Sequence, residues 1–586
     1  MCGIAGIVGK DVKKYTPNAK AMTDAIAHRG PDGEGVAIFD NCLLGQRRLS
    51  IIDLVTGDQP MYSNKNSCVV FNGEFYGYLD TKKQLSYNWK TTSDTEVVLA
   101  LYHQYGENDF VQKIRGMFAF TLWDEPNQVF IAARDRFGEK PFYYAITSSN
   151  EIVYASEVKA ILASGLIEPE LDTEALTHYL QHLYVHPHHS IYKNIFVLPP
   201  AHFLVLKNGK LKIKPYWHLP QQQLKIPKQE AKEECFRLLN KAVKEQLIAD
   251  VPVGCFLSGG IDSSTITALA ALNSENQLTT ISFSFGKKNS ELEFSRKVAE
   301  KYKTSNIELH QDDFDIANWF EKMAEVYDEP FADSSNIPTY LLSQMAATKF
   351  KVVLTGDGGD ELMAGYRNWY PQLYHLQHPE GFSGLIRNIR KKVLHPKYRN
   401  SNIAKIHLEQ NRYFDGTDLQ QLCQFTAVSH FNKFLSQPYN SVDAAMRMDL
   451  NDYMPGDILA KTDRAAMANS LELRAPFLDV DFAEFCIALP EDFKINNHND
   501  KILIRESFGH LWPGEITNRH KQGFGAPVSE WLQQNKMLEL KNELLLNRKN
   551  KIFNWLNYES VLSYSKKNNY QTWILLTLAL WMEKHL

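Results

Sequence analysis

The chain has 586 residues, a net charge of −4, and a composition that is 44% hydrophobic and 23% charged. This length predicts two to four domains with their own cores, and the composition is typical of globular proteins. The charge excludes a general attraction to nucleic acid or to an anionic surface, and no apolar run is long enough to span a bilayer, so we expect neither nucleic acid nor membrane as a partner.

The seven cysteines form no CxxC pair, so we expect reduced thiols and a cytoplasmic location. The chain begins Met1-Cys2-Gly3 without a basic or apolar leader, so we expect no signal peptide. The small side chain of Cys2 permits removal of Met1. The α-amine then exposed has a pKa near ~8 and lies beside the thiol as its base, which makes Cys2 a candidate nucleophile for acyl transfer.

Five motifs follow in the first third of the chain: His28-Arg29-Gly30-Pro31-Asp32, 46–53, Phe71-Asn72-Gly73-Glu74, Ser93-Asp94-Thr95-Glu96 and 133–138. Apolar stretches typical of strands lie at 67–71, 117–123, 129–133 and 142–145, and 94–103 predicts a helix. This spacing predicts two stacked antiparallel sheets flanked by helices. From Cys2 to about His202, the motif order resembles the class II glutamine amidotransferases of the N-terminal-nucleophile hydrolase type. The resemblance implies their α/β/β/α sandwich; the alternative is an unrelated antiparallel domain.

Hydrolysis of the glutamine amide passes through an oxyanion that needs preset donors, and losing one typically costs roughly 3 kcal/mol. By resemblance, the Asn72 side chain and the Gly73 backbone N–H are these donors. Arg48 would hold the α-carboxylate of glutamine as a planar fork. Asp94, helped by Glu74, would hold the α-ammonium group. The alternative for Arg48 and Asp94 is a surface ion pair, which contributes little.

The polar stretch His218–Glu230, rich in Gln, Lys and Pro, predicts a linker, and we set its bounds at 211–230. We therefore expect a first domain at 2–210 and a second at 231–586. Two positions of the first domain depart from the family pattern: Gly77 replaces a common Asn, and Glu139 replaces a small apolar residue. Neither is an assigned catalytic position.

A strand is predicted over 251–257 and a helix over 265–272, with Ser258-Gly259-Gly260-Ile261-Asp262-Ser263-Ser264 between them. A strand, a glycine turn and a helix N-terminus form an anion site. The absence of Gly-Lys-Ser/Thr excludes a Walker A loop. The segment resembles the Ser-Gly-Gly-x-Asp-Ser-Ser loop of the ATP pyrophosphatases, which implies cleavage of ATP between its α- and β-phosphates; the alternative is an ordinary glycine turn. The residues expected to bind ATP here are Leu257, Ser258, Gly259, Gly260, Asp262 and Ser263.

Strands alternate with helices farther along, at 279–285, 291–302 and 351–354. This order predicts a doubly wound parallel sheet, with ligands at the carboxyl ends of its strands. We therefore expect Phe285, Thr355 and Gly356 beside the nucleotide. Core packing is the alternative for Phe285, because strand aromatics are often buried.

Asp262 and Asp360 follow two of these strands and carry the hard oxygen ligands that suit Mg²⁺ on pyrophosphate oxygens. The alternative is that both acids cap loops, where Asp is frequent. By resemblance to relatives with an acid at this position, Asp357 would assist deprotonation of the nucleophile.

Residues 453–465, 471–479 and Lys521-Gln522-Gly523-Phe524 resemble the synthetase half of asparagine synthetases. Lys461 would stabilise negative charge on the transferring phosphoryl and acyl oxygens; a solvated surface lysine is the alternative. Residues 385–400 are rich in Lys and Arg, and with Tyr398 as the one stacking residue they indicate a solvated helix face rather than a nucleic-acid patch.

Nearly the whole chain thus resembles the glutamine-hydrolysing asparagine synthetases. The resemblance implies that Cys2 releases ammonia from glutamine while the second half adenylates L-aspartate with MgATP. Ammonia would then cross a dry channel and displace AMP, and the family implies a homodimer. Other acceptors stay open, namely a sugar uronic acid or the acid of a specialised metabolite. A β-lactam-forming relative would not need Cys2, and a non-catalytic paralogue would not need all of these residues. We expect residues 328–335 to line the acceptor pocket.

Overall fold

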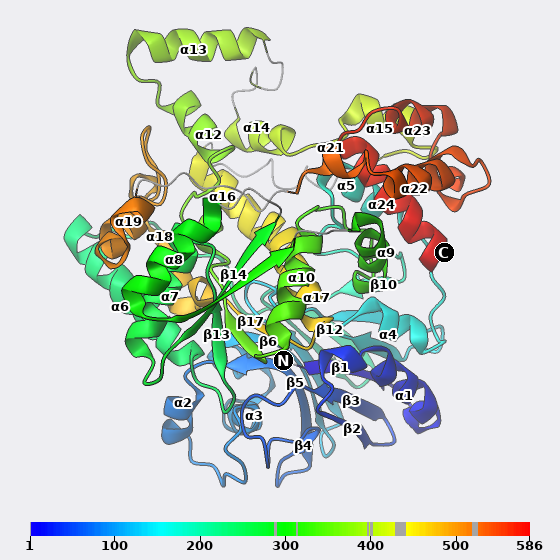
Figure 1. The fold of residues 1–586 in the computed structure, drawn as a ribbon. Coiled ribbons are helices and arrows are strands. Elements are labelled where there is room, and N and C mark those ends of the chain that lie inside the picture. The colour runs from blue at the N-terminus through cyan, green and yellow to red at the C-terminus, as the bar shows by residue number, and fades with distance from the viewer. Residues whose placement is uncertain are drawn as a thin grey trace.

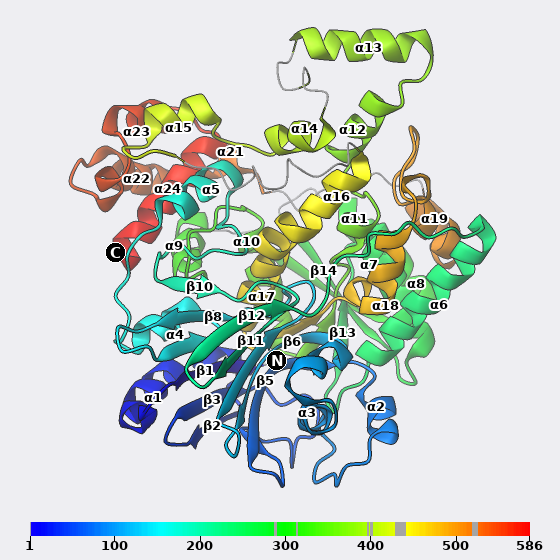
Figure 2. The ribbon, with the colours of Figure 1, turned by 180° about the vertical axis from the view of Figure 1, so that it is seen from behind.

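The computed structural model describes residues 2–285, 290–311, 315–394, 398, 402–427, 441–517 and 526–586. The first third of the chain packs against a unit built on a parallel sheet, and the two share a long interface (Figures 1 and 2). Among the described residues, no helix combines the length and apolar character that a bilayer crossing requires.

Two six-stranded antiparallel sheets form the N-terminal unit. The first, in the order β10-β8-β9-β1-β3-β2, contains β1 Cys2–Val8, β2 Gly33–Ile38, β3 Cys42–Arg48, β8 Tyr143–Ile146, β9 Ile152–Ala155 and β10 Ile195–Val197. The second, in the order β12-β11-β7-β6-β5-β4, contains β4 Met61–Tyr62, β5 Ser67–Phe75, β6 Gly116–Asp124, β7 Val129–Arg134, β11 His202–Lys207 and β12 Lys210–Pro215.

Strand β5 shows how the layers stack. Its side chains alternate in direction, so Val70 packs with Ile4 of β1 between the sheets, whereas Phe71 packs with Val97 on the other face. Val97 lies on α3 (Thr95–Asp109), which covers the second sheet, and α1 (Thr16–Ala25) and α4 (Val158–Ala163) cover the first. The predicted α/β/β/α sandwich is confirmed.

A five-stranded parallel sheet forms the centre of the second unit, in the order β15-β14-β13-β16-β17. Its strands are β13 Val253–Phe256, β14 Thr279–Phe285, β15 Ser305–Gln311, β16 Val352–Leu354 and β17 Glu472–Arg474. On one face Leu354 packs with α6 (Lys228–Gln246) and α7 (Ile261–Asn273), and on the other Val353 packs with α10 (Asn336–Ala347) and α17 (Leu459–Met467). The predicted doubly wound sheet is also confirmed.

Helices complete the second unit. They are α8 Ser290–Tyr302, α9 Ile316–Val326, α11 Gly359–Leu362, α12 Tyr370–Gln377, α13 Gly381–Leu394, α14 Ile403–Gln410, α15 Gly416–Leu422, α16 Val442–Asn451, α18 Val480–Ala488, α19 Ile502–Phe508, α20 Gly514–Thr517, α21 Val528–Trp531, α22 Asn535–Leu546, α23 Tyr558–Ser565 and α24 Tyr570–His585, with α2 Tyr78–Gln84 and α5 Thr173–His182 in the N-terminal unit. Helix α24 is buried, and its Trp573 and Trp581 indoles donate to the carbonyls of Ala332 and Asp328, at 3.0 and 2.9 Å. These bonds fix the segment expected to face the acceptor.

The segment between the units is shorter than the predicted linker 211–230. Strand β12 continues to Pro215 because it pairs with β11, and α6 already begins at Lys228, which leaves 216–227 between them. The hydroxyl of Tyr216 donates to the Arg134 carbonyl at 2.9 Å, and the Trp217 indole donates to Glu484 at 2.5 Å. The segment therefore follows the surface of both units, and the division into 2–210 and 231–586 stays a proposal.

Candidate active site

Cys2, the predicted nucleophile, is buried at the start of β1. Its backbone N–H donates to Oδ1 of Asn72 at 2.9 Å, and in the strand register it lies opposite Arg48. Burial raises the pKa of the Cys2 thiol, and the nearby Leu49 N–H and Arg48 guanidinium offset part of that rise. The thiol is therefore protonated at neutral pH and needs a base to react.

The two predicted oxyanion donors follow on β5. Asn72 is buried, and within the described part of the chain its Nδ2 has no hydrogen-bond partner. At Gly73, with a φ of 154°, a Cβ atom would lie 2.0 Å from the Met117 carbonyl oxygen, so no larger residue fits. The side-chain amide of Asn72 therefore accepts the Cys2 N–H through its oxygen, and its nitrogen keeps an unused donor in the described part of the chain.

The predicted glutamine-binding residues surround this point. Arg48 is held by the carbonyls of Ile52 and Asp53, at 3.2 and 2.6 Å, and it also pairs with the exposed Asp58 at 2.8 Å. A substrate carboxylate could replace Asp58 without disturbing the rest. Asp94 precedes α3 and accepts the Phe75 N–H at 2.9 Å, and burial raises its pKa.

Glu74 shows a contact that the motifs did not predict. Burial and the charge of Glu472 raise its pKa, while Arg474, 3.3 Å away, opposes that rise. Both new residues belong to β17 of the second unit, and Arg474 also contacts Glu472 at 2.6 Å. Both lie within the motif 471–479 that resembles asparagine synthetases, but nothing in that motif indicated a contact with Glu74.

The predicted ATP loop joins β13 to α7. Gly259 has a φ of 70°, and a Cβ atom there would lie 2.7 Å from Cβ of Phe294. Gly260 precedes the first residue of α7, and the Ser258 and Ser263 hydroxyls are hydrogen-bonded at 3.0 Å. Leu257 is buried below the turn. The backbone N–H groups in the first turn of an α-helix have no partner within the helix, so the start of α7 meets the requirement for an anion site.

The loop after β16 meets the ATP loop. A Cβ atom at Gly356 would lie 3.0 Å from Cβ of Asp262, and Thr355 donates through its hydroxyl to Asp357 at 2.9 Å. Strand β14 ends at Phe285 beside β13, but the Phe285 side chain lies outside the described residues, as does the predicted motif 521–524.

The two predicted metal ligands, Asp262 and Asp360, both contact the ammonium group of one lysine. Lys501 contacts Asp262 and also Asp360, the latter at 2.6 Å. Oδ1 of Asp262 is buried without a hydrogen-bond partner in the described part of the chain. Two convergent carboxylates, one with an unused oxygen, fit a divalent cation at the pyrophosphate position. Lys501 itself was not predicted.

Lys461 lies in the first turn of α17, with its ammonium 2.7 Å from Asp333 and 3.9 Å from Asp457. Burial alone would lower the pKa of Lys461, but Asp333 and Asp457 raise it, so the side chain is charged. The same pair lowers the pKa of Asp333 to about 2 despite burial, which acts the other way. The charge of Asp357, in the nucleotide loop, also raises the pKa of Lys461. Lys461 is thus a buried cation between the nucleotide loop and Asp333.

A cavity of about 290 Å³ continues from Asp333 and Asp457. Its walls carry four aspartates, two histidines, an arginine and several aromatic rings: Asp333, Asp449, Asp452, Asp457, His182, His407, Arg412, Tyr184, Trp369, Tyr413, Tyr453 and Tyr570. Of the acids in the predicted acceptor segment 328–335, only Asp333 faces this cavity; Asp328 pairs with Lys159 at 3.1 Å, and Glu329 accepts from Tyr143 at 2.9 Å.

Comparison with known proteins agrees with this layout. A family model for asparagine synthase matches residues 235–583, and one for a glutamine amidotransferase domain matches residues 1–217. The glutamine-hydrolyzing asparagine synthetase 1 of Bacillus subtilis (strain 168) is 31% identical over 99% of this chain and 96% of its own. Putative asparagine synthetase 2 of Methanocaldococcus jannaschii is 38% identical over 62% of this chain and 76% of its own. Amidase chry2 of Gibberella zeae is 28% identical, with 91% and 90% covered. The chain therefore belongs to the asparagine synthase family of ATP-dependent ligases that take their amide nitrogen from glutamine.

Proposed function

We propose that the chain converts L-aspartate to asparagine with ATP and glutamine, releasing glutamate, AMP and pyrophosphate. The observation that carries the proposal is the position of Arg474. Its guanidinium contacts Glu74 of the glutamine pocket at 3.3 Å, while its carbonyl accepts the N–H of Thr355 in the nucleotide loop at 2.8 Å. One residue thus touches both candidate sites, which supports two coupled reactions.

In the first reaction, the Cys2 sulfur attacks the side-chain carbonyl of glutamine, and ammonia leaves as a thioester forms. The α-amine exposed by removal of Met1 would take the thiol proton, because burial keeps the pKa of that thiol high. Asn72 Nδ2 and the Gly73 N–H would stabilise the oxyanion. Arg48 would bind the α-carboxylate, and Asp94 with Glu74 the α-ammonium group. Water then hydrolyses the thioester to glutamate.

In the second reaction, the acceptor carboxylate attacks the α-phosphorus of ATP, and pyrophosphate leaves. The turn from Ser258 to Ser263 would hold the phosphates, and Lys461 would stabilise charge on the acyl and phosphoryl oxygens. A divalent cation held by Asp262 and Asp360 would neutralise the leaving pyrophosphate. Ammonia then attacks the acyl carbon and AMP leaves, with Asp357 as the acceptor of the extra proton.

Ammonia must reach the adenylate before it is protonated in bulk water. A cavity of about 70 Å³ lies between the units, with Gly138 and Tyr143 on one side and Gly456 and Asp463 on the other. This cavity supports a sheltered route. Full competition by external ammonia against glutamine-derived ammonia during coupled turnover would contradict such a route.

The acceptor is tested by pyrophosphate release with ATP, glutamine and a panel of carboxylic acids. Release with L-aspartate alone would support the proposal. A second candidate is a larger acid such as a sugar uronic acid. The volume of the acceptor cavity is about twice the ~150 Å³ of a cavity that holds benzene, and aromatic side chains line its walls. Release with a uronic acid but not with aspartate would favour that candidate.

A further inference from the structure

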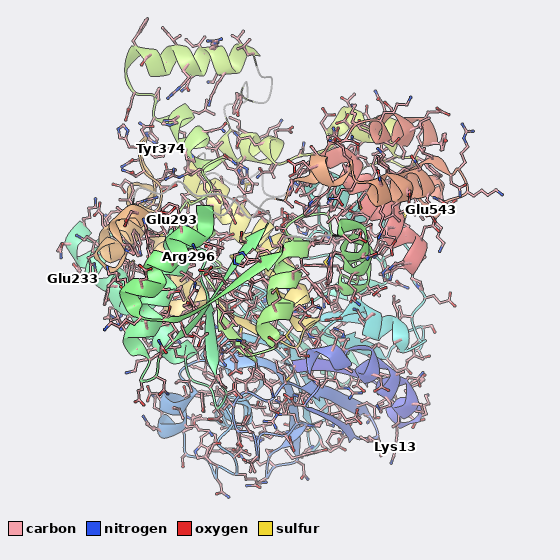
Figure 3. All side chains as sticks on the ribbon, in the orientation of Figure 1. Lys13, Glu233, Glu293, Arg296, Tyr374 and Glu543 are labelled. Carbon is pink, nitrogen blue, oxygen red and sulfur yellow. The ribbon has the colours of Figure 1, made fainter. Side chains whose placement is uncertain are left out.

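Helix α13 (Gly381–Leu394) stands away from the rest of the molecule, at the end opposite the N-terminal unit (Figures 1 and 2). It has 14 residues, which corresponds to about 21 Å of helix. Figure 3 shows its side chains projecting beyond α12, where Tyr374 marks the base of the projection. The helix is therefore accessible along most of its length.

The apolar face of α13 lies in solvent. The helix buries Gly384 and Asn388, and Asn388 Nδ2 donates to the carbonyls of His375 and Leu376 in α12, at 3.0 and 3.3 Å. In contrast, Phe382 is 79% exposed and Ile389 63%, and Leu385 and Ile386 are each 50% exposed. At 100° per residue these four side chains fall within one arc of about 100°. A helix that buries glycine and asparagine while exposing phenylalanine and five aliphatic residues, Val393 and Leu394 included, is not placed to serve the core.

The polar residues of α13 are basic. The helix contains Arg387, Arg390, Lys391 and Lys392 and no acidic residue, in a chain whose net charge is −4. Arg390 and Lys392 lie at opposite borders of the apolar arc on the helical projection. An apolar arc bordered by cations on both sides is the pattern of helices that lie in the interface of a bilayer.

We propose that α13 docks the protein on the surface of a bilayer rich in anionic phospholipid. The apolar arc would enter the boundary between headgroups and acyl chains, to a depth of about 5–10 Å. The arginines and lysines would meet the phosphates, and each adds favourable attraction near an anionic surface. A second copy of the chain would suit the apolar arc, but a symmetric pairing would bring two basic helices together, whereas an anionic surface attracts them. This inference is independent of the amidation chemistry, and it revises the expectation that the chain has no membrane partner.

The docked orientation has a consequence for the acceptor cavity. Helix α14, which follows α13 in the chain, contributes His407 and Gln410 to the cavity wall, and Trp369, just before α12, contributes another part. The end of the molecule that carries the acceptor cavity is thus the end that α13 would turn toward the lipid.

Vesicle flotation with the full chain tests the proposal. Vesicles of phosphatidylcholine mixed with an equal part of phosphatidylglycerol should carry the protein, and vesicles of phosphatidylcholine alone should not. Raising the salt concentration should weaken the binding, because exposed charges are screened. No flotation with the mixed vesicles would overturn the proposal, as would equal flotation with both.

Substitutions locate the contact. Ile389→Ser should lower the partition coefficient roughly tenfold or more, because it removes a side chain that inserts into the bilayer. The matched control is Leu272→Ser, which removes an apolar side chain of similar exposure, 60%, from α7. Arg387→Gln and Arg390→Gln should each lower the coefficient about fivefold.

Glutamine hydrolysis in solution serves as the check on folding for every variant. Equal vesicle binding by Ile389→Ser and Leu272→Ser would refute the role of α13. Sedimentation would identify the alternative occupant: if Ile389→Ser dissociates a dimer while the parent protein ignores vesicles, a second copy covers this face and the proposal fails.

Discussion

The buried guanidinium of Arg29 donates two hydrogen bonds to the carboxylate of Asp463, at 2.8 and 3.0 Å, across 434 residues of sequence. Nε of the same guanidinium donates to the carbonyl of Cys2 at 3.2 Å. Asp463 lies on α17, two positions beyond Lys461. A continuous set of polar contacts therefore joins the backbone of the glutamine nucleophile to the helix that carries the synthetase lysine.

Replacing Asp463 by Asn should uncouple the two reactions. The change leaves Arg29 buried with Glu157 as its remaining carboxylate partner, at 2.8 Å, and breaking such a pair costs about 3 kcal/mol. We expect a lower unfolding midpoint and more glutamate formed per amide. The control is Glu559→Gln, whose exposed pair with Arg548 contributes little. A parent-like ratio of glutamate to amide would contradict the coupling role.

Replacing Cys2 by Ala should abolish synthesis from glutamine, by roughly a thousandfold or more, and spare synthesis from ammonium. The thiol is the proposed nucleophile of the first reaction only. Pyrophosphate release with each nitrogen source measures the split. Cys423→Ala, at a half-buried free cysteine of the second unit, is the control and should behave like the parent protein. Persistent glutamine-fed synthesis in Cys2→Ala would remove the basis of the mechanism.

Replacing Asn72 by Ala should lower kcat for glutamine hydrolysis by about 10²- to 10³-fold, because one oxyanion donor is lost. The effect should fall on kcat more than on KM, since the donor acts on charge that develops during reaction. Steady-state glutamate release measures both constants. A pure rise in KM would instead place Asn72 in substrate binding.

The pair of Lys461 and Asp333 should make stability depend on acid pH. The pKa of Asp333 is about 2 in the folded chain, below its ordinary value of 3.8, so the contribution is complete above about pH 4 and is lost as pH falls toward 2. Urea unfolding of Asp333→Asn should show a deficit of about 2 kcal/mol at neutral pH that disappears near pH 2. A deficit that is constant over this range would show that the pair's charge is not responsible.

Much of the fold followed from the sequence because its elements bury regular patterns. Strand β14 runs over 279–285, as predicted, since its alternating β-branched and aromatic residues have no competing turn signal. The predicted linker 211–230 covers most of β12, which is an exposed edge strand rich in lysine, a common protection for sheet edges. Its pairing with β11 could not be inferred from that composition.

The candidate site was predictable where one motif supplies a whole feature, as in the turn from Ser258 to Ser263. It was not predictable where two distant segments meet. Lys501 joins Asp262 across 239 residues, and Arg474 reaches Glu74 from the other unit. The basic residues of α13 were visible in the sequence. The side of the helix that is covered was not, because it is set by the packing of Asn388 against α12.

Replacing Asp262 by Asn should raise the Mg²⁺ concentration needed for pyrophosphate release, by at least about tenfold. The carboxylate shares Lys501 with Asp360, and its unused oxygen is the proposed metal ligand. Calorimetric binding of ATP with and without Mg²⁺ gives a second readout that does not require turnover. Asp360→Asn should act in the same direction, whereas Asp315→Asn, at an exposed pair with Lys536, should leave the Mg²⁺ dependence unchanged. Glutamine hydrolysis without ATP should be normal in all three variants, because none of the three carboxylates belongs to the residues placed around Cys2. Unaltered Mg²⁺ dependence in both Asp262→Asn and Asp360→Asn would place the cation elsewhere.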